Sequence, residues 1–205
     1  MLDFFVYRLW PGIAAWTVLY ISDYAMTIWC ASLYQKHVRQ TITFEGSYEL
    51  TPVYQRDVDA LRRVSPRFVA ALASSVAVLA LLWVSVRASL PLLYAFVLGA
   101  LLLLEVTVHV RHVRNLSMFR DIAKGGSIHG RIEYSRPMVL RMSAVELVAF
   151  SGMYFVIFLF TQSWFVLGGA AACVSTARKH FMLARKSAAP AVPAHPAYPA
   201  VLIHF

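Results

Sequence analysis

The chain has 205 residues, of which 60% are hydrophobic and only 14% are charged. Soluble domains carry about 25% charged residues, so this composition excludes an ordinary soluble globular protein. The formal net charge is +9. The basic residues form no patch on a soluble fold with aromatic or groove-entering elements, so we expect no nucleic-acid partner.

Five stretches of the chain are nearly free of charge and continuous rather than alternating in polarity. A hydrocarbon core about 30 Å thick needs roughly 20 apolar helical residues to cross it. We therefore predict an all-α integral membrane bundle of about five transmembrane helices, at residues 9–34, 68–86, 89–113, 139–160 and 163–183. They form a single domain over residues 1–186, with connections at 35–67 and 114–138 and an Ala/Pro-rich tail at 187–205.

The basic residues are distributed very unevenly between the two ends of these helices. Of 19 Lys and Arg, 17 fall in or directly beside the two long connections and around the end of the fifth helix, and only Arg8 and Arg87 fall on the other side. The positive-inside rule then predicts an external N-terminus and a cytoplasmic C-terminus. Anionic lipid headgroups on the cytoplasmic side are the expected counter-charges.

The two long connections carry the only expected structure outside the membrane. Residues 41–50 are predicted to form a short hairpin around Gly46, and residues 51–66 an amphipathic helix lying on the membrane. In the second connection, the glycines at 125, 126 and 130 predict a flexible loop over 121–137.

Small residues in the fifth helix, around Gly168 and Gly169, allow close helix contacts in lipid. The contact is either packing inside the bundle or an interface between subunits, so we also expect a homo-oligomer or a subunit of a membrane complex.

Three carboxylates lie inside apolar runs: Asp23, Glu105 and Glu146. An unpaired charge at the bilayer centre costs at least about 2.5 kcal/mol, so each needs a partner. His109 and His112 follow Glu105 at spacings of 4 and 7 residues. These spacings place all three side chains on one helix face.

Three interpretations of this helix face compete. The first is an ion or proton pathway, in which buried carboxylates and imidazoles change charge in response to burial and to one another. Its residues are Asp23, Glu105, His109 and Glu146.

The second interpretation is a site for a divalent transition metal such as Zn, Fe or Mn, which carboxylate and imidazole suit. Its ligands are Glu105, His109 and His112. The third is structural, with the carboxylates paired to neighbouring groups that lock the bundle. Those groups are Arg111, Arg114, Arg141, Tyr20, Tyr24 and Ser143.

The first 55 residues carry a further pattern: Asp23-x-x-x-Thr27, followed by Glu49-Leu50-Thr51-Pro52. This resembles the D-x-x-x-T and E-x-N-P motifs of some small uncharacterised prokaryotic multi-pass membrane proteins. The chain departs from them in having Thr51 in place of Asn and a longer connection between the motifs. The resemblance implies an inner-membrane protein with a cytoplasmic-side role for Asp23, Thr27 and Glu49, and it assigns no activity.

We therefore predict a small channel or transporter for protons, cations or another small solute. The alternative is a noncatalytic structural or assembly subunit of a larger membrane complex. A third interpretation is a metal-dependent membrane enzyme acting at the cytoplasmic interface. The chain lacks H-E-x-x-H and G-x-S-x-G, so an enzyme is less expected than a non-enzyme.

Overall fold

The structure is a computed structural model, and it describes residues 7–125 and 130–187. The Ala/Pro-rich tail beyond residue 187 lies outside the described residues. Within them the chain is mostly helical, with a short π-helical turn η1 and two short strands. The elements are α2 (Leu9–Leu33), η1 (Tyr34–Val38), β1 (Ile42–Phe44), α3 (Gln55–Asp59), α4 (Pro66–Val86), α5 (Pro91–Ala123), β2 (Ile132–Tyr134), α6 (Arg136–Thr161) and α7 (Trp164–Ser187).

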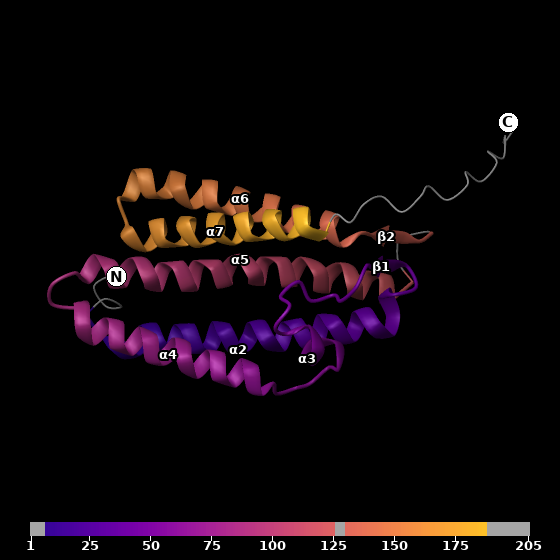
Figure 1. The fold of residues 1–205 in the computed structure, drawn as a ribbon, viewed down its shortest axis with the longest axis horizontal. Helices are drawn as coiled ribbons and strands as arrows, with labels where there is room; N and C mark the ends of the chain where they lie inside the picture. The colour runs from indigo at the N-terminus through magenta and orange to yellow at the C-terminus, as the bar shows by residue number, and fades with distance from the viewer. Residues whose placement is uncertain (1–6, 126–129, 188–205) are drawn as a thin grey trace, which may run out of the picture.

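The long helices form a bundle in which α5 lies between two pairs (Figure 1). Helices α2 and α4 lie on one side of α5, and α6 and α7 lie on the other. The start of α2 and the turns between α4 and α5 and between α6 and α7 lie at one end of the bundle. Both strands, α3 and the end of α7 lie at the opposite end.

Three of the described helices are long and apolar enough to cross a membrane: α4, α5 and α6. Helix α2 contains several tryptophans and tyrosines, and α7 contains many small and polar residues, so both are less hydropathic. The structure is thus that of a helical protein with membrane-compatible helices.

Proline and capping residues set the helix starts. Pro66 and Pro91 stand in the first turns of α4 and α5, where the missing N–H costs nothing. The Ser65 hydroxyl caps α4 by accepting the backbone N–H of Phe68 at 3.3 Å. At the other end of α6, Gln162 takes a left-handed conformation with φ 50°, which turns the chain sharply into α7.

Helix α5 continues to Ala123, about three turns beyond the end at residue 113 that the sequence indicated. The extension carries charged residues, yet its Leu116 and Phe119 are buried against Tyr34, Val38 and Ile42. Packing against the end of α2 and against η1 therefore holds a segment that looks like a loop in the sequence.

The two long connections are joined to each other. Strand β1 pairs in parallel with β2, with Ile42 opposite Ile132 and Phe44 opposite Tyr134. This pairing replaces the expected hairpin within residues 41–50 and gives order to part of the expected loop at 121–137. The amphipathic helix expected over 51–66 is confined to the five residues of α3.

Backbones approach closely between α5 and α7. A Cβ atom added to Gly168 would collide with the Phe96 carbonyl oxygen, and one added to Gly99 would collide with that of Phe165. The small residues of α7 are therefore used for packing inside the bundle.

Candidate functional site

A polar face of α2 meets a polar face of α5. The two helices run side by side in the same direction, and residues of α2 contact residues 87 and 89 positions later on α5. On α2, Asp23 and Thr27 share this face. On α5 it is formed by Glu105, His109 and His112, so the sequence-predicted helix face is directed at α2.

The centre of this face is a group of three potential ligands. One donor atom each from Asp23, Glu105 and His109 lie within 4.8 Å of one another. Glu105 is 9% exposed. Within the part of the chain that the structure describes, its Oε2 atom is buried and has no hydrogen-bond partner. A buried oxygen in that position is costly unless a proton or cation accompanies it.

The imidazole of His109 is held at both nitrogens. Its Nδ1 lies 2.7 Å from the backbone carbonyl oxygen of Glu105, so Nδ1 carries the hydrogen and donates it. Its Nε2 lies 2.7 Å from the Ser22 hydroxyl, which also reaches the carbonyl of Leu19 at 2.9 Å. The Ser22 hydroxyl can donate to a neutral His109 or accept from a protonated one, so the same geometry serves both states.

His112 holds Asp23 in place. Its Nε2 atom lies 2.8 Å from Asp23 Oδ1 and 3.2 Å from Thr27 Oγ1. A carboxylate accepts, so Nε2–H is the donor to Asp23. The Cys30 thiol donates to the His112 carbonyl oxygen at 3.8 Å. His112 is thus a neighbour of the three-residue group, and its Nε2 is already engaged.

The first long connection covers this region from one end of the bundle. The Tyr20 and Tyr54 hydroxyls lie 3.0 Å apart, and Tyr24 donates to the carbonyl oxygen of Arg62 at 2.8 Å. The rings of both α2 tyrosines stack on Phe68. These contacts fasten residues 54–68 against the polar side of α2.

Glu49 belongs to the same connection and is half-buried. Burial raises the pKa of its carboxyl above the ordinary value, and the negative charge of Asp23 raises it further. A hydrogen bond from the Thr51 N–H, 2.7 Å from Oε1, acts in the opposite direction, as does His112. Glu49 therefore senses the cluster electrostatically, although no hydrogen bond joins it to Asp23 or His112 within the described residues.

Glu146 lies elsewhere. Its carboxylate accepts from Arg111 at 2.7 Å and from Arg114 at 3.0 Å, both on a different face of α5 from His109. Glu146 and Arg111 are largely buried, with side chains 17% and 15% exposed. The structure does not bring Glu146 to the cluster, and its ion pairs match the structural interpretation of the buried carboxylates.

An apolar cluster closes the interface on the side of the α2 N-terminus. Its buried members are Trp16, Leu79, Tyr94, Leu98 and Leu102. The Trp16 indole N–H donates to Ser75 at 2.7 Å, which fastens α2 to α4. Among the residues that the structure describes, no charged side chain belongs to this layer.

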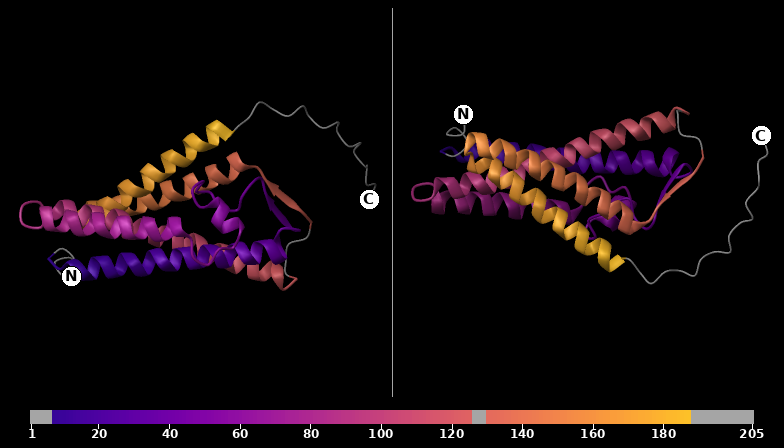
Figure 2. Two further views of the ribbon diagram at one scale, coloured as in Figure 1. Left: turned by 60° about the horizontal axis from the view of Figure 1, so that its bottom comes forward. Right: turned by 90° about the horizontal axis from the view of Figure 1, so that it is seen from above.

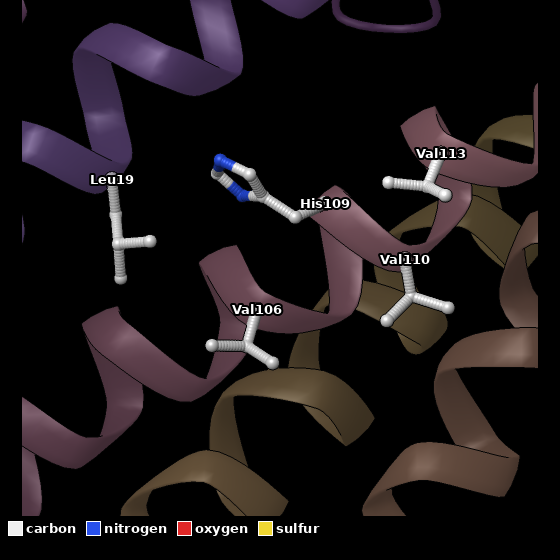
Figure 3. Close-up of a pocket in the computed structure, with 5 residues that line it drawn as sticks. All are labelled: Leu19, Val106, His109, Val110 and Val113. Atoms are coloured by element: carbon white, nitrogen blue, oxygen red, sulfur yellow. The ribbon is translucent and has the colours of Figure 1, made fainter. Parts of the chain in front are cut away.

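A shallow groove of about 320 Å³ opens beside His109 on the outside of the bundle. Figure 3 shows the imidazole between α2 and α5, with the groove lined by aliphatic side chains. The lining residues are Leu19, Val106, His109, Val110 and Val113. The three valines are exposed, so this groove presents a hydrocarbon surface in front of the polar group.

The sequence did not predict that Ser22 and Cys30 contribute to the site. A signal for Cys30 was present, because Asp23, Thr27 and Cys30 repeat on α2 the spacing of 4 and 7 residues found on α5. Ser22 lies next to that face and carries no comparable signal. No protein-family model, curated protein or solved structure matches this chain.

Proposed function

We propose that this chain is a multi-pass inner-membrane protein that carries a proton or a small cation across the bilayer. In this proposal Asp23, Glu105 and His109 are the exchanging groups. The observation that carries the proposal is the buried Glu105 oxygen, which lacks a partner among the described residues and faces a second carboxylate and an imidazole.

The arrangement of helices supports five membrane crossings with an external N-terminus. Successive long helices run in opposite directions, so the two long connections and the end of α7 lie together at one end of the bundle (Figure 1). That end carries 17 of the 19 basic residues. In this topology it faces the cytoplasm, where anionic lipid headgroups attract it.

The depth of the cluster also supports transport. Glu105 follows Pro91, the first residue of α5, by 14 positions, which corresponds to about 21 Å at 1.5 Å per residue. If α5 enters the hydrocarbon core near Pro91, the cluster lies inside the core on its cytoplasmic side. Ionisable groups at such depth commonly mark pathways for protons or ions.

Hydrogen bonding around the cluster suits reversible charge. Two adjacent carboxylates in a low-dielectric setting resist being ionised together, so a proton or cation that binds one of them is shared by both. His109 keeps its hydrogen bonds in either protonation state because the Ser22 hydroxyl rotates. A proton can therefore enter or leave without breaking the helix contact.

The apolar layer beyond the cluster favours a carrier over an open pore. Toward the cytoplasmic end, Asn115 donates to the Tyr48 hydroxyl at 3.3 Å beside the buried apolar cluster that contains Leu116 and Phe119. On the other side, a buried apolar cluster blocks a path for ions between the helices; its members are Trp16, Leu79, Tyr94, Leu98 and Leu102. A bound ion therefore leaves on that side only after α2 and α5 move relative to each other.

Flux measurements in proteoliposomes test this function. We expect the purified protein to carry protons, read with an internal pH dye, or Mn²⁺, read by quenching of internal calcein. Glu105→Gln should lower the carried flux at least tenfold, and Asp23→Asn should do the same. Asp121→Asn is the matched control, because it removes an exposed carboxylate from the same helix.

Flux of neither ion, or equal flux in Glu105→Gln and the wild type, would contradict the proposal. Each variant is first checked for a single symmetric peak by size exclusion and for an unchanged helical circular dichroism spectrum. Loss of flux in Asp121→Asn would show that any removal of a carboxylate from α5 is harmful, and would contradict the role given to Glu105.

A further inference from the structure

We infer that Asp23, Glu105 and His109 form a binding site for one divalent transition-metal ion of the Mn²⁺, Fe²⁺ or Zn²⁺ class. The inference names the cargo of the proposed transport. It rests on the proposed function only for the passage of the ion through the membrane, whereas binding is measured separately.

The spacing of the donor atoms fits an ion. Oxygen and nitrogen ligands of Zn²⁺ lie at about 2.0–2.2 Å from the metal in tetrahedral geometry, so two ligands are about 3.4 Å apart. The donors of Asp23, Glu105 and His109 lie within 4.8 Å of one another. Inward movement of these side chains therefore brings all three donors into coordination range.

The charge of the site also fits. Two carboxylates contribute two negative charges, which a divalent cation neutralises within a single shell. Glu105 Oε2, which has no partner within residues 7–125 and 130–187, is the atom whose desolvation the ion would offset most.

The supporting hydrogen bonds are those of a metal site. His109 donates from Nδ1 to the Glu105 carbonyl oxygen at 2.7 Å, which fixes the ring and leaves Nε2 as the ligand atom once Ser22 turns away. Asp23 is held by His112 at 2.8 Å, which leaves its other oxygen for the metal. Outer contacts of this kind orient metal ligands and raise affinity.

The donor set selects the class of metal. One imidazole with two carboxylates suits Mn²⁺, Fe²⁺ and Zn²⁺. Ca²⁺ prefers six to eight oxygen ligands. Copper(I) prefers thiolates and thioethers, and the nearby Cys30 thiol is directed at the His112 carbonyl instead.

Metal binding to the purified full-length chain tests the inference. Tag-free protein in mild detergent, stripped with a chelator, is titrated with Mn²⁺ and with Zn²⁺ by calorimetry, and with Co²⁺ by visible absorption. We expect one equivalent of each metal and a Co²⁺ spectrum that includes a nitrogen ligand. Glu105→Gln and His109→Ala should each weaken the affinity by more than about 100-fold.

Two further sets of variants separate ligands from neighbours. His112→Gln keeps all three ligands and should weaken affinity by only about 10-fold, with the stoichiometry of one preserved. The matched controls are His37→Ala and Asp121→Asn, which alter exposed residues outside the cluster and should leave affinity unchanged. Unchanged binding in both Glu105→Gln and His109→Ala would overturn the site.

The outcomes distinguish this inference from the proposed function. Proton flux without saturable metal binding overturns the metal site and leaves a proton carrier. Stoichiometric metal binding that depends on Glu105 and His109, with no flux of either ion, supports the site and overturns transport.

Discussion

Helix α5 has two sides that are built in opposite ways. Toward α7, glycines let the backbones touch, and the nearby Thr107 hydroxyl, Tyr154 hydroxyl and Leu103 carbonyl satisfy one another at 3.0–3.2 Å. Toward α2, the buried Glu105 Oε2 and His112 Nδ1 have no partner among the described residues. Groups left unsatisfied in an otherwise well-packed protein commonly belong to functional sites. On the side that faces α6, Arg111 Nη2 is also buried without a partner among the described residues, but its guanidinium is paired with Glu146. The contrast assigns rigidity to one side of α5 and chemistry to the other.

The largest expected effect is on the packed side. Gly168→Ala places a methyl group against the Phe96 carbonyl, a backbone atom that cannot turn away. We expect destabilisation at or above the upper end of the roughly 1–3 kcal/mol typical of overpacking. Thermal unfolding in detergent, followed by circular dichroism, measures it.

Gly152→Ala on α6 is the matched control, because nothing lies within 4 Å of the added Cβ. It should leave the unfolding temperature unchanged or raise it slightly through helix propensity. Equal effects of the two substitutions would show that α5 and α7 are not in backbone contact.

The second prediction compares two buried carboxylates. Glu146→Gln leaves the largely buried Arg111 without its counter-charge, so we expect a loss of about 3 kcal/mol in the free energy of unfolding. Glu105→Gln breaks no such pair and should leave stability unchanged or higher in metal-free protein. Chemical unfolding of both variants in one detergent gives the two values.

If Glu105→Gln is destabilised as much as Glu146→Gln, both carboxylates are structural and the contrast between the two sides of α5 disappears. If Glu105→Gln is more stable than the wild type and has lost flux, the contrast between the two sides of α5 is strengthened. A side chain that lowers stability and supports transport has a functional role.

The smallest effect concerns Glu49 and pH. Burial raises the pKa of Glu49 in the folded state. At low pH its carboxyl is neutral in both the folded and the unfolded protein, but as the pH rises the unfolded chain ionises first, and folding must then bury or protonate the carboxylate. Its contribution to stability is therefore present below the ordinary carboxyl value and is lost as pH rises through the raised one. The Glu49→Gln variant should be more stable than the wild type at neutral pH and similar to it in acid.

Unfolding temperatures of both proteins between about pH 4 and pH 8 measure this difference. Glu133→Gln is the control, because that carboxylate is exposed and should give a difference that does not grow with pH. A gap for Glu49→Gln that stays constant with pH would contradict the raised pKa.

The sequence predicts some of these features and cannot predict others. Continuous apolar runs mark the long helices, and the spacing of Glu105, His109 and His112 predicts their shared face. The rotation of neighbouring helices is not encoded in one helix's own pattern. Sequence alone therefore assigned both Asp23 and Glu146 to that group, whereas the structure places Asp23 there and pairs Glu146 with Arg111 and Arg114.

The connections show a different limit. Residues 114–123 look like a loop because arginines interrupt them, and only contact with η1 and β1 reveals why they remain helical. The pairing of β1 with β2 joins segments 90 residues apart in the chain. A strand of three residues has too short a hydrophobic pattern to predict which segment it pairs with.

That strand pair has a mechanical consequence. Helices α2 and α4 diverge from α6 and α7 toward the end of the bundle where the strands lie (Figure 2). There the backbone of β1 is bonded to that of β2, and Glu45 accepts the Arg136 N–H at 2.9 Å. Helix packing therefore sets the spacing of the two halves at one end of the bundle. At the other end, the paired segments 42–45 and 132–136 set it.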